Sequence, residues 1–182
     1  MTETKLQKNR NGLASMTKGD SPDIRRVPVR FWAHDLFVEV TRERTIEHIL
    51  RVVATDHALK IEDLYVVRDG EDARLACDEP IHDEHQRRHH VHHRHPVTVT
   101  VNYQAASQQR KFRRHAKLEA VLDWAIRVFG IDASMAGEFE LTRTGSTEEL
   151  PLSDHIGHIA AKRDELALDL VRGDIANGGL HD

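Results

Sequence analysis

The chain has 182 residues, of which 39% are hydrophobic and 31% charged, and its formal net charge at pH 7 is -4. This composition is typical of a globular protein, and the small negative charge excludes the broad basic field of a nucleic-acid-binding domain. No run of about 18 apolar residues occurs, which excludes a membrane-spanning helix. The single cysteine, Cys77, excludes an intramolecular disulfide and favours a reducing, cytoplasmic location.

The N-terminal residues 1–26 lack the apolar stretch of a secretory signal and are rich in Thr, Lys, Asn, Ser and Gly. Such a segment cannot bury enough apolar surface to offset the entropy that the chain loses on folding. The sequence therefore predicts a disordered N-terminal tail.

A pattern of strands around one helix follows this tail. Apolar and polar residues alternate over 27–31 and over 36–40, which predicts two strands. A helix is expected from Thr45, because the next apolar residues recur three or four positions apart: Ile46, Ile49, Leu50 and Val53. A strand at 64–67 and a shorter extended stretch towards Ile81 complete the pattern.

The same pattern returns 72 residues later, as the distance from Ile46 to Leu118 shows. Alternating residues at 97–103 predict a strand, and a second strand is expected around Phe112. The helix that follows ends at Gly130, a typical C-terminal stop, and its apolar stripe is again regular: Leu118, Val121, Leu122, Ala125 and Phe129.

This repeat predicts two tandem α+β domains, in each of which a mixed sheet buries one face on a helix. The first domain is expected at 27–96 and the second at 97–173, followed by a flexible C-terminal tail at 174–182. Only Pro96 separates the predicted last strand of the first domain from Val97, which favours a rigid junction.

Three short motifs, in the right order, resemble ubiquitin. Thr45-Ile46-Glu47 is similar to the start of the ubiquitin helix, Leu152-Ser153-Asp154-His155-Ile156 to its Leu-Ser-Asp-Tyr-Asn-Ile motif, and Leu166 to Gly173 to its closing strand. The resemblance covers roughly 27–179 and implies that both domains have the ubiquitin-like β-grasp fold. The four residues 174–177 depart from the short basic run that joins this strand to the diglycine of ubiquitin.

The end of the chain carries a diglycine, Gly178-Gly179, followed by Leu180-His181-Asp182. A tandem protein of this kind resembles bacterial modifiers encoded beside an activating enzyme, a conjugating enzyme and a JAB-type peptidase, in operons implicated in antiphage defence. The resemblance implies cleavage between Gly179 and Leu180 and conjugation of Gly179 to target proteins. The protein itself is then not an enzyme and needs no cofactor. The competing hypotheses are a non-covalent β-grasp adaptor or scaffold and, third, a His-rich protein that binds metal through residues 82–95.

Seven histidines lie within the fourteen residues from His82 to His95. Because alternate side chains of a strand share a face, His93 and His95, or His90 and His92, are candidate ligands for zinc or nickel. Matching the two repeats places Val91 at the position of Leu166. The alternative interpretation is a solvated edge strand with adventitious metal affinity, since no cysteine pattern accompanies the histidines.

Two surfaces are further candidates for binding. Trp32 and Phe37 fall out of phase with the buried positions of their strands, and either form an exposed interaction patch or pack at a half-buried edge. The basic residues of Arg87-Arg88 and of 109–114 could contact phosphates. Four acidic residues of the second domain offset that charge, so nucleic acid is not an expected partner: Glu138, Glu140, Glu148 and Glu149.

Overall fold

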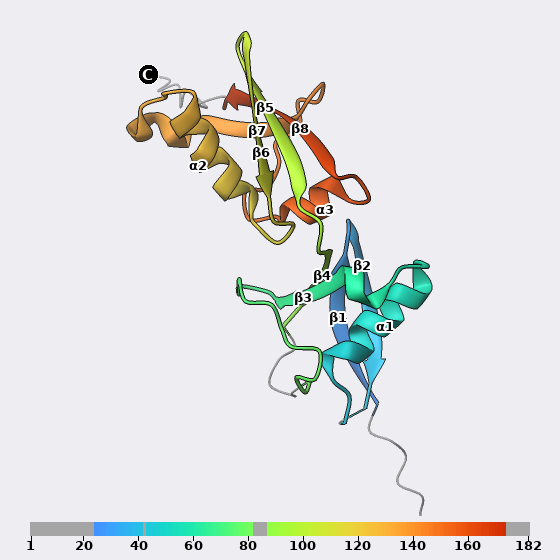
Figure 1. Ribbon diagram of the computed structural model, residues 1–182. Coiled ribbons are helices and arrows are strands. Elements are labelled where there is room, and N and C mark those ends of the chain that lie inside the picture. Colours follow the sequence, from blue (N-terminus) through green and yellow to red (C-terminus); the bar gives the residue numbers. More distant parts are fainter. Residues whose placement is uncertain (1–23, 42, 82–86, 174–182) are drawn as a thin grey trace, which may run out of the picture.

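The computed structural model describes residues 24–41, 43–81 and 87–173, which form two domains placed end to end (Figure 1). The first domain contains β1 (Arg25–Phe31), β2 (His34–Val40), α1 (Ile46–Asp56), η1 (Ile61–Asp63), β3 (Leu64–Arg68) and β4 (His89–His93). The second contains β5 (Val97–Tyr103), β6 (Ala106–Phe112), α2 (Leu118–Val128), η2 (Ala133–Glu138), β7 (Phe139–Arg143), α3 (Ile156–Ala160) and β8 (Glu165–Arg172).

Both sheets have four strands and the same topology. Their strand orders are β2-β1-β4-β3 and β6-β5-β8-β7. The two central strands of each sheet run parallel, and each outer strand is antiparallel to its neighbour. A helix between the second and third strands packs on one face of each sheet. This is the β-grasp arrangement, so the predicted fold class, two tandem ubiquitin-like domains of the α+β class, is confirmed.

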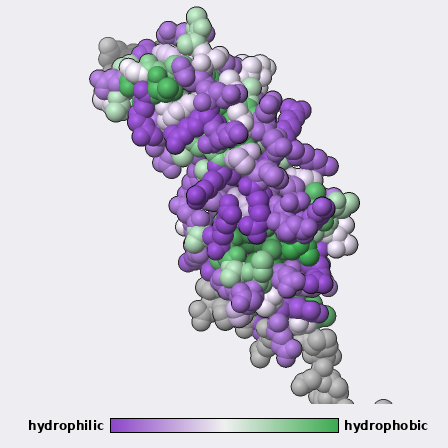
Figure 2. Space-filling view, in the orientation of Figure 1, coloured by the Kyte–Doolittle hydropathy of each residue, from purple (hydrophilic) through white to green (hydrophobic). Residues whose placement is uncertain are grey.

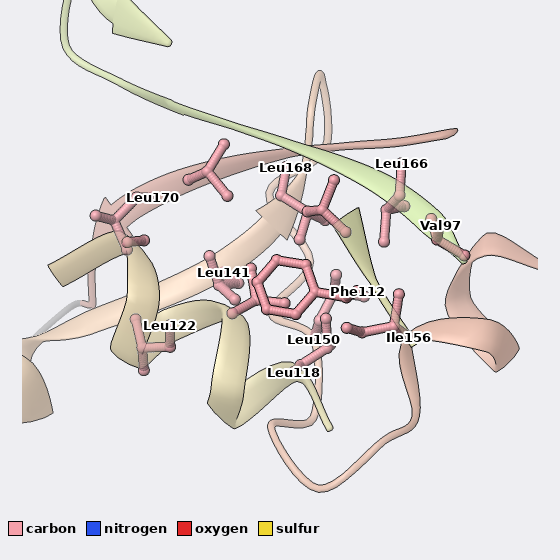
Figure 3. Close-up of a cluster of buried hydrophobic side chains, with 14 of the residues drawn as sticks. Val97, Phe112, Leu118, Leu122, Leu141, Leu150, Ile156, Leu166, Leu168 and Leu170 are labelled. Atoms are coloured by element: carbon pink, nitrogen blue, oxygen red, sulfur yellow. The ribbon is translucent and has the colours of Figure 1, made fainter. Parts of the chain in front are cut away.

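The helices form where the sequence predicts, because their apolar stripes supply the core. In α1 the stripe residues Ile46, Ile49, Leu50 and Val53 are at most 1% exposed. The α2 stripe meets the inward residues of the second sheet (Figure 3), and ten of the residues that form this core are labelled there: Val97, Phe112, Leu118, Leu122, Leu141, Leu150, Ile156, Leu166, Leu168 and Leu170. On the face shown in Figure 2 hydrophilic residues predominate, and smaller hydrophobic patches lie on both domains.

The register predicted for the last strand of the first domain is wrong by four residues. Val91 pairs with Val66, whereas Leu170 pairs with Leu141 at the equivalent place in the second sheet. Val91 therefore corresponds to Leu170 and not to Leu166. From Arg68 to His89 the chain advances 21 positions, but 25 from Arg143 to Leu168, and the shorter connection shifts the register. The described stretch from Gly70 to Ile81 is held to the domain by isolated β-bridges and backbone hydrogen bonds, and it forms no further strand.

The three residues Arg94–Pro96 join β4 to β5, and the second domain packs directly against the first. In Figure 1, α3 of the second domain lies next to the strands of the first sheet. Among the described helices, none is long and apolar enough to cross a lipid bilayer.

Candidate functional site

The predicted metal-ligating histidines lie on opposite faces of β4. Val91 belongs to the core beneath α1. His93 shares this face, and its ring lies 5.8 Å from that of Phe31 and 6.1 Å from that of Trp32. His90 and His92 point to the other face, as strand geometry requires, with ring centroids 6.4 Å apart. His95 follows the strand and is exposed.

The helix α3 brings two further histidines to the same place. His155 is the residue before α3 and His158 is its third residue, so a separation of three puts both rings on one side of the helical turn. Gly157 lies between them, and a Cβ there would lie 2.7 Å from Nδ1 of His92. A glycine is therefore needed for α3 to approach β4 this closely.

Together, His90, His92, His155 and His158 form a group that we call the histidine cluster. The ring centroid of His155 lies 4.5 Å from that of His90 and 5.1 Å from that of His92. The ring of His158 lies 5.0, 4.9 and 5.1 Å from those of His90, His92 and His155. All four residues are at most 6% exposed. Two domains thus contribute two imidazoles each to one buried site.

Only some nitrogens of the cluster have hydrogen-bond partners. Nε2 of His92 and Nδ1 of His155 are 3.0 Å apart, so one of the two rings donates to the other. Nε2 of His90 lies 3.2 Å from Oδ1 of Asp69 and donates to that carboxylate. Within the described residues, Nδ1 of His90 and both ring nitrogens of His158 are buried without a hydrogen-bond partner.

Burial favours the neutral form of every imidazole in the cluster. It lowers the pKa of His155 from 6.5 to about 4 and the pKa of His158 to about 2. The pKa of His92 is well below its ordinary value because of burial and the neighbouring histidines. Burial also lowers the pKa of His90, although the hydrogen bond to Asp69 opposes that shift. The four rings are therefore uncharged at neutral pH and keep lone pairs for a ligand.

Polar contacts around the histidine cluster join the same two surfaces. Arg30 of β1 pairs with Asp154 over 3.2 Å, and both side chains are about four-fifths buried, with exposed fractions of 23% and 22%. The hydroxyl of Tyr65 lies 2.9 Å from Nδ1 of His115 in a buried contact. The cluster therefore lies inside a continuous interface between the domains.

Arg114 fixes the position of the segment after α3. This residue is 2% exposed, and its guanidinium donates to the carbonyl oxygens of His95, Ala161 and Arg163 and to the carboxylate of Asp164. Its donors reach both the linker and the α3 loop. Arg114 thus serves the domain junction and is not part of an exposed basic run, although the sequence grouped it with its basic neighbours.

The two aromatic residues predicted as a patch are separated by burial. Trp32 is 8% exposed, stacks on Phe31 at 4.2 Å and lies beneath Nζ of Lys162 at 4.7 Å. Phe37 is 65% exposed. Trp32 therefore belongs to the core edge and the domain interface, and Phe37 is the exposed member of the predicted pair.

Sequence reasoning missed His155 and His158. Residues 152–156 resemble a ubiquitin motif, so the fold alone accounted for this stretch. The alignment of the two repeats does not predict that the stretch lies near β4. Their His-x-x-His spacing was the available signal, because it puts two imidazoles on one side of a helical turn. The predicted processing residues Gly178, Gly179 and Leu180 lie outside the described residues.

The second domain matches a known family model. Residues 98–173 match the family model described as BilA ubiquitin-like domain 2. No curated protein sequence matches the chain.

Three solved structures illustrate the similarity in fold. Caldiarchaeum subterraneum ubiquitin aligns with 11% identity over 44% of this chain and 98% of its own, with a TM-score of 0.36. The N-terminal ubiquitin-like domain of the 4931431F19Rik protein aligns with 11% identity over 43% of this chain and 76% of its own, with a TM-score of 0.35. A chain of the pParkin-pUb-UbcH7 complex aligns with 10% identity over 43% of this chain and 23% of its own, with a TM-score of 0.37. The fold assignment rests on strand order, register and the family match, since these TM-scores are low.

Proposed function

We propose that the protein is a ubiquitin-like modifier that is cleaved after Gly179 and then joined through the Gly179 carboxylate to amines of target proteins. The observation that carries this proposal is the match of residues 98–173 to BilA ubiquitin-like domain 2. The match ends at Gly173, and the diglycine Gly178-Gly179 follows five residues later in the sequence.

The end of the described chain suits this role. The strand β8 is an inner strand of its sheet, paired with β5 and β7, and ends at Arg172. The backbone N–H of Gly173, the last described residue, donates to the carbonyl of Glu138 at the end of η2 at 2.8 Å. Residues 178–180 come after this fold in the sequence, so we expect their substitution to leave the core contacts of the second domain in place.

The proposal assigns the chemistry to partner enzymes. An activating enzyme, a conjugating enzyme and a JAB-type peptidase would act on the tail, and the protein would be their cytoplasmic substrate. The antiphage role implied by the resemblance belongs to the same proposal. In this proposal the protein is the substrate of these enzymes and not itself an enzyme.

Co-expression with these three enzymes tests the proposal, with an N-terminally tagged chain and mass spectrometry as the readout. Wild type is expected to lose Leu180-His181-Asp182 and to form adducts linked through Gly179. The Gly179→Phe variant should form none, with an unchanged melting temperature. A chain ending at Gly179 is the matched control, because it should form adducts without the peptidase.

The opposite result favours the adaptor hypothesis. If wild type still ends at Asp182 and no Gly179-linked adduct forms with all three enzymes present, the modifier proposal is wrong. If a chain that ends at Gly179 also forms no adduct, then activation or conjugation fails as well, and not only cleavage by the peptidase.

A further inference from the structure

The side chain of His158 presents the clearest unexplained feature of the interface. It is 2% exposed, and within the described residues neither ring nitrogen has a hydrogen-bond partner. Buried polar groups in native proteins are almost always satisfied, by protein, by water or by an ion. The two unmet nitrogens of this buried imidazole therefore point to a ligand between the domains.

The neighbouring imidazoles offer lone pairs to the same place. Asp69 accepts the N–H of Nε2 on His90, which leaves Nδ1 of that ring as a buried lone pair without a partner. A carboxylate that holds the far nitrogen of a histidine is the usual support of a metal-bound imidazole, because it fixes the tautomer and raises the basicity of the ligand nitrogen. The contact with His92 orients the ring of His155 in a similar way.

The distances allow one ion to bridge three of these rings. One ligand nitrogen each from His90, His155 and His158 lies within 4.8 Å of the others. Bonds of about 2.0–2.1 Å to a tetrahedral zinc ion place ligand nitrogens about 3.3 Å apart, so the rings need to close by about 1.5 Å at most. Side-chain rotation can supply a movement of that size. The ring centroid of His92 lies within 5.1 Å of those of His155 and His158, so His92 lines another side of the same site.

We propose that His90, His155 and His158 bind a single zinc ion, which joins the two ubiquitin-like domains across their interface. Neutral imidazoles suit zinc, copper and nickel and are poor ligands for magnesium or calcium. A tetrahedral zinc ion takes four ligands, so these three imidazoles fill three positions and leave the fourth to water or to the neighbouring ring of His92. The low pKa values of the cluster mean that protons compete little with the metal near neutral pH.

The site differs from the one that the histidine-rich run predicts. His93 and His95 belong to that run but lie outside the cluster, and His155 and His158 belong to the cluster but lie outside the run. This separation makes the two interpretations distinguishable by mutation. The proposal is also independent of conjugation, since it concerns the junction of the domains and not the tail.

Metal titration of the full chain without an affinity tag tests the proposal. Wild type, stripped with a chelator and dialysed, is expected to bind one zinc ion with sub-micromolar affinity and to show the visible absorption of tetrahedral cobalt when Co²⁺ replaces zinc. His158→Gln should weaken zinc binding by more than about 100-fold. Asp69→Asn, which keeps all the histidines, should weaken it by about 10-fold to 100-fold.

Matched controls come from the same histidine run. His93→Gln and His95→Gln remove imidazoles near the site in sequence, and His95→Gln in particular should leave affinity, stoichiometry and the cobalt spectrum unchanged. Circular dichroism of each variant establishes that it is folded. Because Asp69 is exposed on its far side and lies outside both cores, Asp69→Asn keeps the test valid even if His158→Gln unfolds.

Three results would overturn the proposal. The first is weak binding of several ions that His158→Gln and Asp69→Asn leave unchanged, which would mean adventitious affinity of the exposed histidines. The second is loss of binding in His95→Gln with normal binding in Asp69→Asn. The third is no binding by folded wild type, which would make the cluster a metal-free contact between the domains.

Discussion

His92 and Val171 occupy equivalent places in the two domains, yet His92 is 2% exposed and Val171 is 36% exposed. Their equivalence follows from pairing, since His92 pairs with Tyr65 and Val171 with Glu140, the second residues of β3 and β7. Both point away from the helix of their own domain. The second domain covers the face of the first sheet that carries no helix, whereas the equivalent face of the second sheet is open to solvent.

The strands that carry these residues differ in the same way. In β3 and β4 the first four residues are buried on both faces of the sheet. In β8 the buried leucines alternate with more exposed residues, and Asn102, Thr144 and Asp169 form hydrogen bonds on the outer face. A shared fold therefore fixes which face meets the helix, but the outward side chains decide whether the other face forms an interface.

Substitution of the equivalent core residues Leu50 and Leu122 should give the largest effect. Either Leu→Asp change puts a carboxylate against a sheet, at positions that are 1% and 7% exposed. Burying an unpaired charge costs several kcal/mol, a large part of the stability of a domain. We expect loss of the domain that carries the change, measured by thermal unfolding. Ala120→Asp on the exposed side of α2 is the control, and a native-like melt for both Leu→Asp variants would contradict the fold.

A glutamate at the two equivalent outward positions tests the comparison directly. His92→Glu leaves an uncompensated charge in the interface and should cost about 3–5 kcal/mol of unfolding free energy. Val171→Glu, on the open face, should change stability by less than about 0.5 kcal/mol. Denaturant unfolding measures both, and small-angle X-ray scattering shows whether His92→Glu separates the domains. Equal effects would mean that the two faces do not differ.

The sequence predicted the fold because its signals are local. Helices α1 and α2 follow from apolar residues three and four apart, and the strands from alternation. The register of β4 failed because His89–His93 offers almost no apolar pattern, so a shift of four residues left no visible conflict. Spacing from the second repeat could not correct this, since the connection before β4 is shorter.

The cluster could be predicted only in part. The run around Val91 identified His90 and His92, because alternation on a strand is local information. Their partners His155 and His158 are 63 or more positions away, and only the docking of one domain on the other brings them near. For Trp32 the sequence left an exposed patch and a half-buried edge open, and local pattern could not decide between them because Lys162 of the second domain also covers its ring.

Acid should weaken the covered interface more than the open face, in protein kept metal-free with a chelator. The pKa of His155 is about 4 in the folded protein and near 6.5 when exposed, so the unfolded state binds more protons between these values. Stability is therefore retained above pH 6.5 and lost as pH falls towards 4. Four charged groups face the cluster: Asp69, which raises the pKa of His90 and of His155, and Arg30, Arg88 and Lys117, which lower the pKa values of the histidines beside them. Burial is the largest cause and lowers the pKa of each histidine.

From pH 7 to pH 5 we expect His155 to contribute a loss of about 2 kcal/mol, because one pKa unit corresponds to about 1.4 kcal/mol. Denaturant unfolding at pH 7, 6 and 5 measures the loss. In His155→Gln the loss of unfolding free energy from pH 7 to pH 5 should be smaller by about this amount. An identical dependence in wild type and His155→Gln would show that His155 is already solvated in the folded protein.

The smallest expected effect concerns two ion pairs that arginines of β1 make, one across the interface and one within the first sheet. Arg30 and Asp154 pair across the interface at 3.2 Å with exposed fractions of 23% and 22%, whereas Arg26 and Glu39 pair within the sheet at 3.7 Å with exposed fractions of 72% and 63%. Water and salt screen the second pair, so its coupling energy should be close to zero. Partial burial reduces that screening for the first pair, and a double-mutant cycle with Arg30→Gln and Asp154→Asn should give about 0.5–1 kcal/mol. The same cycle with Arg26→Gln and Glu39→Gln is the control. Equal coupling in both cycles, or coupling of the first pair that disappears at moderate salt, would mean that water reaches this pair and that other contacts, such as the histidine cluster and the bonds of Arg114, hold the domains in register.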